Sequence, residues 1–322
     1  MLKHDPTPWL MSQDGEAAVR ARRRLGRVRD DDEEPVRSTA RRLAKAQRAD
    51  GSFAGSPLKT AGALCLLDDL RAASAEQVAA AGAEYLLGVL QSQRGYGRAR
   101  DVRPGGLGTA CDLCGFFGPY DERNRPDVRS WGAAEMNHFR RAEPLLGPKS
   151  PVRADRRGSR DRRGPGSCFE WGLLPLSYVI EALCRAGFAG DARLAPAVNA
   201  LLGAQRHSGG WCRNLGGHPN CSLYAIRALA AHPRLRTGKH AERALTMMRA
   251  SQRSMGTWWR GSKLFAALDA VSRFDLPLAR DILRHGLAAA APRQRANGSF
   301  GAPCPVERVA AAVSAARAIR RG

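Results

Sequence analysis

Gln205-Arg-His-Ser-Gly209-Gly-Trp211 is one of five versions of the same short phrase in this chain of 322 residues. The other four read Gln47-Arg-Ala-Asp-Gly51-Ser-Phe53, the contracted Gln93-Arg-Gly95-Tyr96, Gln252-Arg-Ser-Met-Gly256-Thr-Trp258 and Gln294-Arg-Ala-Asn-Gly298-Ser-Phe300. The phrase, which we call the clasp, starts at residues 47, 93, 205, 252 and 294. A spacing of about 45 residues indicates stacked supersecondary units. The double-length gap between the second and third starts predicts that one copy is missing there.

Each clasp lies between two stretches with helical periodicity. Before Gln205, for example, Leu194, Val198 and Leu201 fall on one helical face. The glycine suits the tight or left-handed backbone that ends a helix. The aromatic residue suits an apolar plug, and the glutamine amide can bond backbone groups at helix ends. We therefore predict that the clasp is structural rather than catalytic.

The periodicity predicts twelve helices in two sets. The first set, expected on the outside, ends at the clasps and spans residues 33–47, 76–92, 130–146, 191–205, 239–252 and 277–291. The second set is richer in apolar and small residues, as an inner layer requires. It spans residues 57–71, 106–118, 168–187, 219–231, 261–274 and 304–320. A further helix is expected over residues 15–26, inside an N-terminal extension of residues 1–32. Six outer–inner pairs that close on themselves predict one all-α domain over residues 1–322, an α/α toroid.

The repeated glutamine–aromatic turns resemble those of the terpenoid cyclase and protein prenyltransferase superfamily over nearly the whole chain. A nearer likeness is to small bacterial stand-alone toroids described as prenyltransferase-like or squalene-cyclase-like, which open with a segment similar to Pro8-Trp9-Leu10. The resemblance implies an (α/α)6 toroid, a double ring of helices. It also implies an isoprenoid or another hydrophobic diphosphate as substrate.

Composition limits the environment and the partners. The formal net charge is +22, and 43% of the residues are hydrophobic. The sequence has no apolar run of about 18 residues, so no membrane-spanning helix is expected. Residues 1–6 lack the apolar segment of a signal peptide. These features predict a cytoplasmic protein with reduced cysteines.

The densest basic stretch covers residues 140–166, where arginines are mixed with glycine, proline and serine. This composition predicts a mobile insertion. Positive charge of this kind suits nucleic acid, an anionic membrane surface or a diphosphate group. No nucleic-acid-binding motif accompanies it, so sequence-specific nucleic-acid recognition is not expected, whereas peripheral membrane contact stays open.

Cysteines gather at the starts of the expected inner helices. Parallel inner helices begin at the same mouth of a toroid, and Cys168 and Cys221 lie at two such starts. Cys212 and His218 lie in the turn before Cys221. Zinc takes three or four Cys or His ligands, and helix N-termini favour thiolates. The sequence therefore predicts a zinc site made by Cys168, Cys212, His218 and Cys221.

Two alternatives stand beside this ligand set. Cys111 and Cys114 form a C-x-x-C pair of common metal spacing, which His138 or Cys168 could complete. The simpler alternative is that the cysteines only pack the helix starts. The same packing role is expected of the remaining Cys65 and Cys184, which lie among leucines and alanines.

The resemblance bears on the metal as well. Protein prenyltransferases bind zinc at the corresponding mouth through an Asp, a Cys that begins an inner helix, and a His. Cys221 matches that Cys by repeat position, but Pro219 stands where the Asp would be. The ligand set implied for this chain therefore differs from theirs.

Three classes of function remain open from the sequence. The first is a transferase or cyclase that acts on an isoprenoid diphosphate, and the second is a zinc-stabilised toroid that serves as a binding module. The third is a toroid hydrolase with paired carboxylates, for which Asp112, Glu170 and Glu307 are candidates. The residues expected to line the pocket are Lys59, Asp112, Glu170, Trp171, Tyr224 and Lys263.

Two acidic motifs are not expected to be catalytic. Residues 30–34, Asp-Asp-Asp-Glu-Glu, are similar to a magnesium-binding motif but suit the N-terminus of the helix that contains Pro35. Asp68 and Asp69 close the first inner helix at the end away from the predicted mouth. The Asp-x-Asp-Asp acid of class II terpenoid cyclases is absent. We therefore expect neither magnesium nor alkene protonation.

Overall fold

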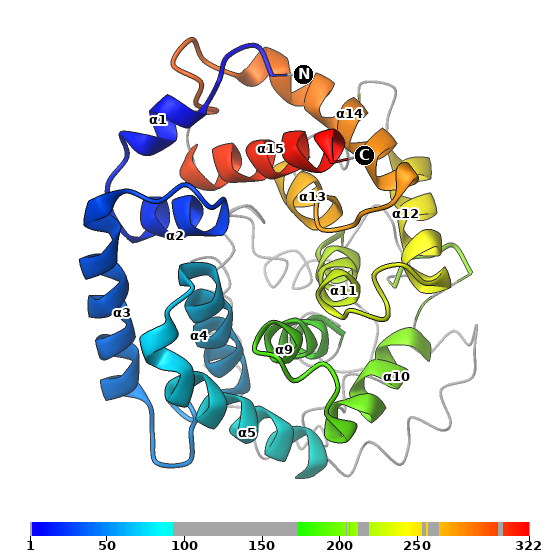
Figure 1. The fold of residues 1–322 in the computed structure, drawn as a ribbon. Coiled ribbons are helices and arrows are strands. Elements are labelled where there is room, and N and C mark those ends of the chain that lie inside the picture. The colour runs from blue at the N-terminus through cyan, green and yellow to red at the C-terminus, as the bar shows by residue number, and fades with distance from the viewer. Residues whose placement is uncertain are drawn as a thin grey trace, which may run out of the picture.

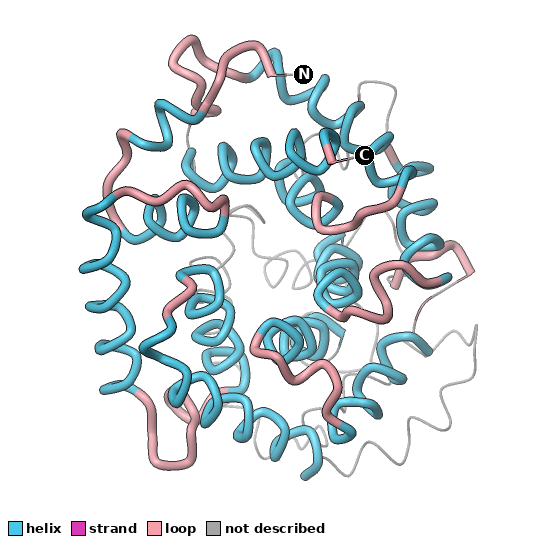
Figure 2. Tube along the Cα trace, in the orientation of Figure 1, coloured by secondary structure: helices cyan, strands magenta, loops and turns pink. Residues whose placement is uncertain are grey.

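The computed structural model describes residues 2–92, 173–203, 205, 207–211, 219–252, 256, 264–301 and 305–321. Within these ranges the secondary structure is helical, joined by turns (Figure 2), which confirms the all-α prediction for this part of the chain. The helices and 3-10 turns are α1 (Thr7–Met11), α2 (Glu16–Arg24), η1 (Asp30–Asp32), α3 (Glu33–Ala46), α4 (Pro57–Leu70), η2 (Ala73–Ala75), α5 (Glu76–Ser92), α9 (Leu173–Arg185), η7 (Ala192–Leu194), α10 (Ala195–Gly203), α11 (Pro219–Ala231), α12 (Lys239–Ser251), α13 (Leu264–Val271), α14 (Pro277–Ala290), η9 (Ala291–Arg293) and α15 (Pro305–Arg320).

Six helices contact one another in a closed circuit. The order of contact is α2, α4, α9, α11, α13 and α15, and α15 contacts α2 again. Figure 1 shows α3, α5, α10, α12 and α14 outside this circuit. The circuit therefore brings the first and last parts of the chain together.

The contrast between α3 and α4 shows why one helix lies outside and the other inside. Glu33 and Glu34 stand in the first turn of α3 and Lys45 in its last, which complements the helix dipole. The helix buries only a narrow stripe. α4, in contrast, is apolar on nearly all sides and is buried almost throughout. At its start, the Ser56 side chain accepts a hydrogen bond from the Lys59 amide and so caps the helix.

Three of the clasp glutamines join their own turn to the next outer helix. Gln47 Nε2 donates to the Gly51 carbonyl of its own turn and to the Val78 carbonyl of α5, both at 2.9 Å. Gln205 makes the same pair of bonds to Gly209 and to His240 of α12, and Gln252 makes them to Gly256 and to Ile282 of α14. The prediction that the amide serves backbone groups is confirmed, although one of those groups lies on a neighbouring helix.

The clasp glycines are required by close packing as well as by backbone conformation. Gly51, Gly209 and Gly256 have φ between +72° and +86°. A Cβ atom at any of them would lie 2.0–2.2 Å from a carbonyl oxygen of the next outer helix. That carbonyl is three residues beyond the one bonded by the glutamine, so each clasp sits on one helical turn.

The aromatic side chains are buried plugs, as predicted. Phe53, Trp211 and Phe300 are all buried, and Trp211 Nε1 donates to the Leu201 carbonyl of α10 at 2.8 Å. In the Gln205 clasp, the aromatic residue therefore bonds a carbonyl near the end of the preceding helix, and the glutamine bonds the following outer helix.

Helix positions follow the periodicity closely. α5 spans residues 76–92 and α11 spans residues 219–231, as predicted, and α2 confirms the additional helix expected near residues 15–26. α13 ends at Val271, three residues before its predicted end, and the short α1 was not anticipated. The helices predicted over residues 106–118 and 130–146, and the basic stretch 140–166, lie outside the described residues. The described helices α4 and α9 pack directly against each other.

Candidate functional site

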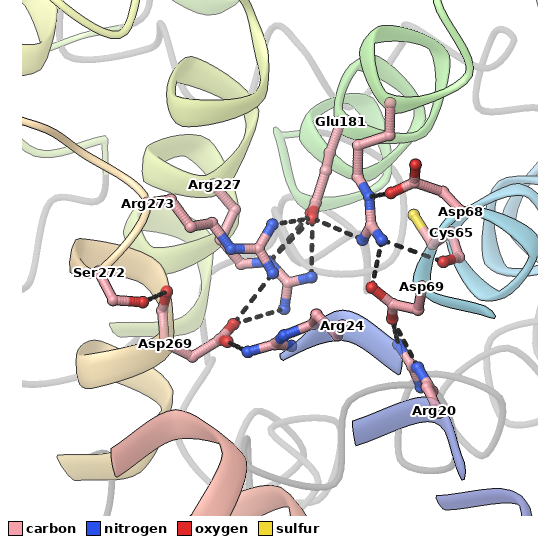
Figure 3. Close-up of polar contacts among 11 residues, drawn as sticks. Arg20, Arg24, Cys65, Asp68, Asp69, Glu181, Arg227, Asp269, Ser272 and Arg273 are labelled. Carbon is pink, nitrogen blue, oxygen red and sulfur yellow. Dashed lines mark hydrogen bonds and ion pairs between the residues drawn. The ribbon is translucent and has the colours of Figure 1, made fainter. Parts of the chain in front are cut away.

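Four apolar inner helices carry charged side chains close to their C-terminal ends. Asp69 is the second-last residue of α4, Glu181 and Arg227 stand four residues before the ends of α9 and α11, and Asp269 is near the end of α13. Figure 3 shows that these side chains point toward one another. We call the group the terminal charge cluster. Its members are Arg20, Arg24, Asp68, Asp69, Glu181, Arg185, Arg227, Asp269 and Arg273.

Glu181 lies at the centre of the cluster and is completely buried. Its carboxylate accepts hydrogen bonds from Arg227 Nη2 at 2.8 Å and from Arg273 Nη1 at 2.6 Å. Arg185 Nη1 lies 3.5 Å away on the same helix. Arg273 follows the end of α13, so this one carboxylate joins α9 to α11 and to α13.

Asp69 holds α2 and α9 against the end of α4. It accepts a hydrogen bond from Arg20 Nε of α2 at 2.6 Å and pairs with Arg185 of α9. Arg185 also donates to Asp68 at 2.7 Å and to the Cys65 carbonyl at 3.1 Å. Three helices therefore depend on this carboxylate and on the guanidinium of Arg185.

Asp269 completes the cluster on the far side. It pairs with Arg24 of α2 and accepts a hydrogen bond from Arg273 Nη2 at 3.1 Å, while Arg227 Nη1 lies 3.8 Å away. The Arg24 pair links α2 to α13, which are not neighbours in the circuit. The cluster therefore spans the circuit as well as following it.

The carboxylates of the cluster stay ionised. Burial by itself would raise the pKa of Glu181, but the charges of Arg227 and Arg273 outweigh it and lower that pKa to about 2. The pKa values of Asp69 and Asp269 are also held well below their usual range, because Arg185 and Arg24 respectively outweigh the effect of burial. General acid catalysis requires a group that carries a proton near the working pH. These three carboxylates do not provide one.

Arginine at this end suits the electrostatics of the helices. The C-terminal end of a helix carries a partial negative charge, and the ends of α2, α4, α9 and α13 meet here. Arg24, Arg185 and Arg273 place positive charge at those ends. The arrangement is therefore a buried structural junction that covers one end of the circuit.

A second buried ion pair accounts for the acidic run over residues 30–34. Arg22 Nε donates to Asp32 Oδ2 at 2.9 Å, and both side chains are buried. The Arg29 amide also donates to Asp32, at 3.0 Å. Glu33 and Glu34 stand in the first turn of α3, as the sequence predicted. Asp32 therefore fixes the turn between α2 and α3.

Most of the site residues predicted from sequence lie where the structure gives no side chain. Cys168, Cys212, His218, Cys111, Cys114, Asp112, Glu170, Trp171 and Lys263 lie outside the described residues. Cys221 is the third residue of α11, but its side chain is outside the described set. Among the side chains that the structure does describe, no three Cys, His, Asp or Glu residues are grouped as metal ligands.

The remaining predicted residues are placed. Lys59 is half-buried in the first turn of α4, and Glu307 is half-buried in the first turn of α15. Tyr224 is buried on α11, where it meets Tyr178 edge-on with ring centroids 5.7 Å apart. The guanidinium of Arg227 lies 5.6 Å from the centre of the Tyr224 ring. Tyr224 therefore belongs to the packing next to the terminal charge cluster.

Cys65 and Cys184 are buried free thiols, as predicted. Burial raises the pKa of each to about 12. Both are therefore uncharged at neutral pH and act as small apolar residues.

Sequence reasoning missed the terminal charge cluster, although it left a signal. Glu181, Arg227 and Asp269 each interrupt an otherwise apolar helix near its C-terminal end. Charged residues are rarely buried unless they are paired. Isolated charges at matching positions in successive apolar helices could have been interpreted as partners.

Comparisons with known proteins returned no match, whether to family models, to curated proteins or to solved structures. None of the helices in the described ranges is both long enough and apolar enough to cross a bilayer.

Proposed function

We propose that the chain is an (α/α)6 toroid of the terpenoid cyclase and prenyltransferase type. In this proposal it takes an isoprenoid or another hydrophobic diphosphate at the mouth where the inner helices begin, with zinc held by cysteine and histidine. The observation that carries the proposal is the terminal charge cluster. It lies at the end where α4, α9, α11 and α13 stop, so we assign the ligand to the end where these helices begin.

The six pairs are obtained by taking each helix of the closed circuit together with the helix that precedes it in the sequence. α3 with α4, α10 with α11, α12 with α13 and α14 with α15 are each joined by a clasp in the sequence. α5 precedes α9 and contacts it. Taking α1 with α2 as the first pair gives six pairs without a further copy of the clasp.

Helix direction favours an anionic ligand at the proposed mouth. Helix N-termini carry partial positive charge and present unpaired amides. α4, α9, α11, α13 and α15 each follow an outer helix; the first four carry residues of the cluster, and α15 contacts α13. Their aligned starts would attract a diphosphate and would stabilise thiolates.

The metal ligands are proposed from their positions in the sequence. Cys168 lies five residues before α9, Cys212 and His218 precede α11, and Cys221 is the third residue of α11. In a toroid these positions belong to one mouth. Zinc held by three of these residues would keep an open position, at which it could activate a thiol or polarise a diphosphate as a Lewis acid, whereas zinc held by all four would be structural.

The cluster does not supply the paired carboxylates of the hydrolase alternative, whose candidates in the sequence are Asp112, Glu170 and Glu307. A glycoside hydrolase needs one carboxylic acid that keeps a proton. The three buried carboxylates that converge here, Asp69, Glu181 and Asp269, are each bound to arginine and have lowered pKa values. The binding-module alternative shares the toroid and the zinc, and it would lack turnover.

Elemental analysis of protein purified without added metal tests the metal. We expect about one zinc per chain, whether the site is structural or catalytic. We also expect its loss in the Cys168→Ser, Cys212→Ser and Cys221→Ser variants. Cys184→Ala is the matched control, because that thiol is buried and free, and it should retain full metal. Absence of zinc in the wild type would reject the ligand set.

Calorimetric titration with an isoprenoid diphosphate tests the ligand. Saturable binding of the isoprenoid diphosphate would support the proposed mouth, provided that inorganic diphosphate alone does not bind. The Lys59→Ala variant should bind the isoprenoid diphosphate more weakly. Turnover to a new product would separate the enzyme from the binding module. No binding to zinc-loaded protein would contradict the proposed substrate class.

A further inference from the structure

The last of the five clasps, built on Gln294 and Gly298, binds a different kind of partner from the three other clasps that the structure describes. Gln47, Gln205 and Gln252 each bond a carbonyl of an outer helix. Gln294 bonds the non-helical backbone of residues 3 and 4, near the start of the chain. Its Oε1 accepts from the Lys3 amide at 2.9 Å and from the His4 amide at 3.0 Å, and its Nε2 donates to the His4 carbonyl at 2.8 Å.

The same slot encloses the backbone that follows. A Cβ atom on Gly298 would lie 2.8 Å from Pro6 Cα and 2.9 Å from the Asp5 carbonyl oxygen. Gln294 is 8% exposed, so its three bonds to the segment form away from water. All of these contacts are made to backbone atoms. The slot therefore selects the bent backbone of residues 3–5 and not their side chains.

The slot distinguishes between peptide sequences at the two flanking positions, which Leu2 and Pro6 occupy. The side chains of Lys3, His4 and Asp5 are exposed. Leu2 packs against the main core, and Pro6 is buried at the start of α1. The bound pattern is thus Leu-x-x-x-Pro, in which the first two intervening residues must keep their amide hydrogens.

We propose that the Gln294 clasp is a peptide-binding slot occupied by residues 2–6, and that the same segment of a second copy of the chain can take its place. The helices bound by the other clasps are held on both sides by further packed elements. Residues 2–6 connect to the rest of the described chain through the five-residue α1. Hydrogen bonds from a side chain to backbone are individually modest, and exchange of an identical segment between copies introduces no new contact. This proposal does not depend on the zinc or on the diphosphate.

The direct test uses a variant that lacks residues 1–6 and a fluorescein-labelled peptide of residues 2–8. Fluorescence anisotropy should report saturable binding of one peptide per chain, and a thermal melt should show that the peptide stabilises the variant. A peptide methylated on the amides of Lys3 and His4 should bind at least about tenfold more weakly, because each lost hydrogen bond to Gln294 weakens binding.

Matched clasp variants show whether the peptide occupies this slot. Gln294→Ala in the truncated chain should abolish peptide binding. Gln252→Ala should leave it unchanged, because that clasp contacts α14. If the truncated chain does not fold, full-length Pro6→Ala, in which the resident segment has lost its buried ring, replaces it in the same titration. Absence of binding to the folded variant, or binding that is insensitive to Gln294→Ala, would overturn the proposal.

Discussion

At the scale of single residues, the glycines show two separate reasons why a position requires glycine. One is a positive φ, and the other is the close approach of a neighbouring backbone. Gly209 and Gly187 have similar backbones, with φ of +86° and +93°. A Cβ atom on Gly209 would lie 2.0 Å from the Arg243 carbonyl oxygen, whereas a Cβ atom on Gly187 would meet nothing within 4 Å. An alanine at either position would therefore have an unfavourable positive φ, but only at Gly209 would its Cβ atom also clash with a neighbouring helix.

We expect Gly209→Ala to destabilise the protein by at least ~2 kcal/mol more than Gly187→Ala. Both variants incur the cost of a left-handed alanine, but only Gly209→Ala must also push α12 away from the clasp. Urea unfolding of the two variants measures the difference. Equal losses of stability would mean that the close approach to α12 contributes nothing.

The two buried thiols give a second prediction at this scale. Burial raises the pKa of Cys65 and Cys184 to about 12, so almost no thiolate is present at pH 8. Both should resist alkylation by iodoacetamide in the native protein and react once it is unfolded. Peptide mapping by mass spectrometry measures each site separately. Rapid native labelling at Cys65 would show that this end of α4 opens to solvent.

At the scale of elements, the terminal charge cluster should control how the inner helices hold together. Glu181→Gln keeps the shape of the side chain but leaves the guanidinium groups of Arg227 and Arg273 buried with less negative charge. Removing one partner from a buried ionic group costs about 3–5 kcal/mol. Glu84→Gln is the control, because its pair with Arg193 is exposed, and it should change stability far less. A small effect of Glu181→Gln in chemical denaturation would argue against the cluster as a junction.

The same substitution should change the response to acid. The pKa of Glu181 is about 2 in the folded chain and 4.5 ordinarily, so the unfolded chain binds the proton more readily. The stability that Glu181 contributes is complete above its ordinary pKa and is lost as the pH falls toward about 2. Glu181→Gln should therefore lose stability less steeply across this window. Parallel pH profiles for the two proteins would refute the assignment.

Secondary structure was predictable at this scale because its signals are local. The apolar face of residues 194–201 and the glycines of the clasps place the helix ends within a few residues of those observed. The partner of Gln205 was not predictable from its own turn, because His240 lies 35 residues away. The same holds for Glu181, whose partner Arg273 is 92 residues distant. The proposed zinc ligands remain a prediction.

At the scale of the whole molecule, the contact between α15 and α2 decides whether the circuit is closed. Arg317 of α15 donates a hydrogen bond to the Leu25 carbonyl after α2. We expect Arg317→Ala to destabilise this seam by ~1–2 kcal/mol and to allow α2 and α15 to open together. Hydrogen exchange should accelerate in both helices and stay unchanged in α11. Acceleration in α15 alone would mean that the two helices do not open as a unit.

The bond between Lys3 and Gln294 also sets the timing of biosynthesis. These residues are 291 positions apart. A ribosome that adds about 5–20 residues per second would expose the first of them roughly 15–60 s before the second emerges. During that interval Leu2 and Pro6 have no slot to enter, so the nascent chain carries apolar side chains that a chaperone can recognise until its last helix pair has been made.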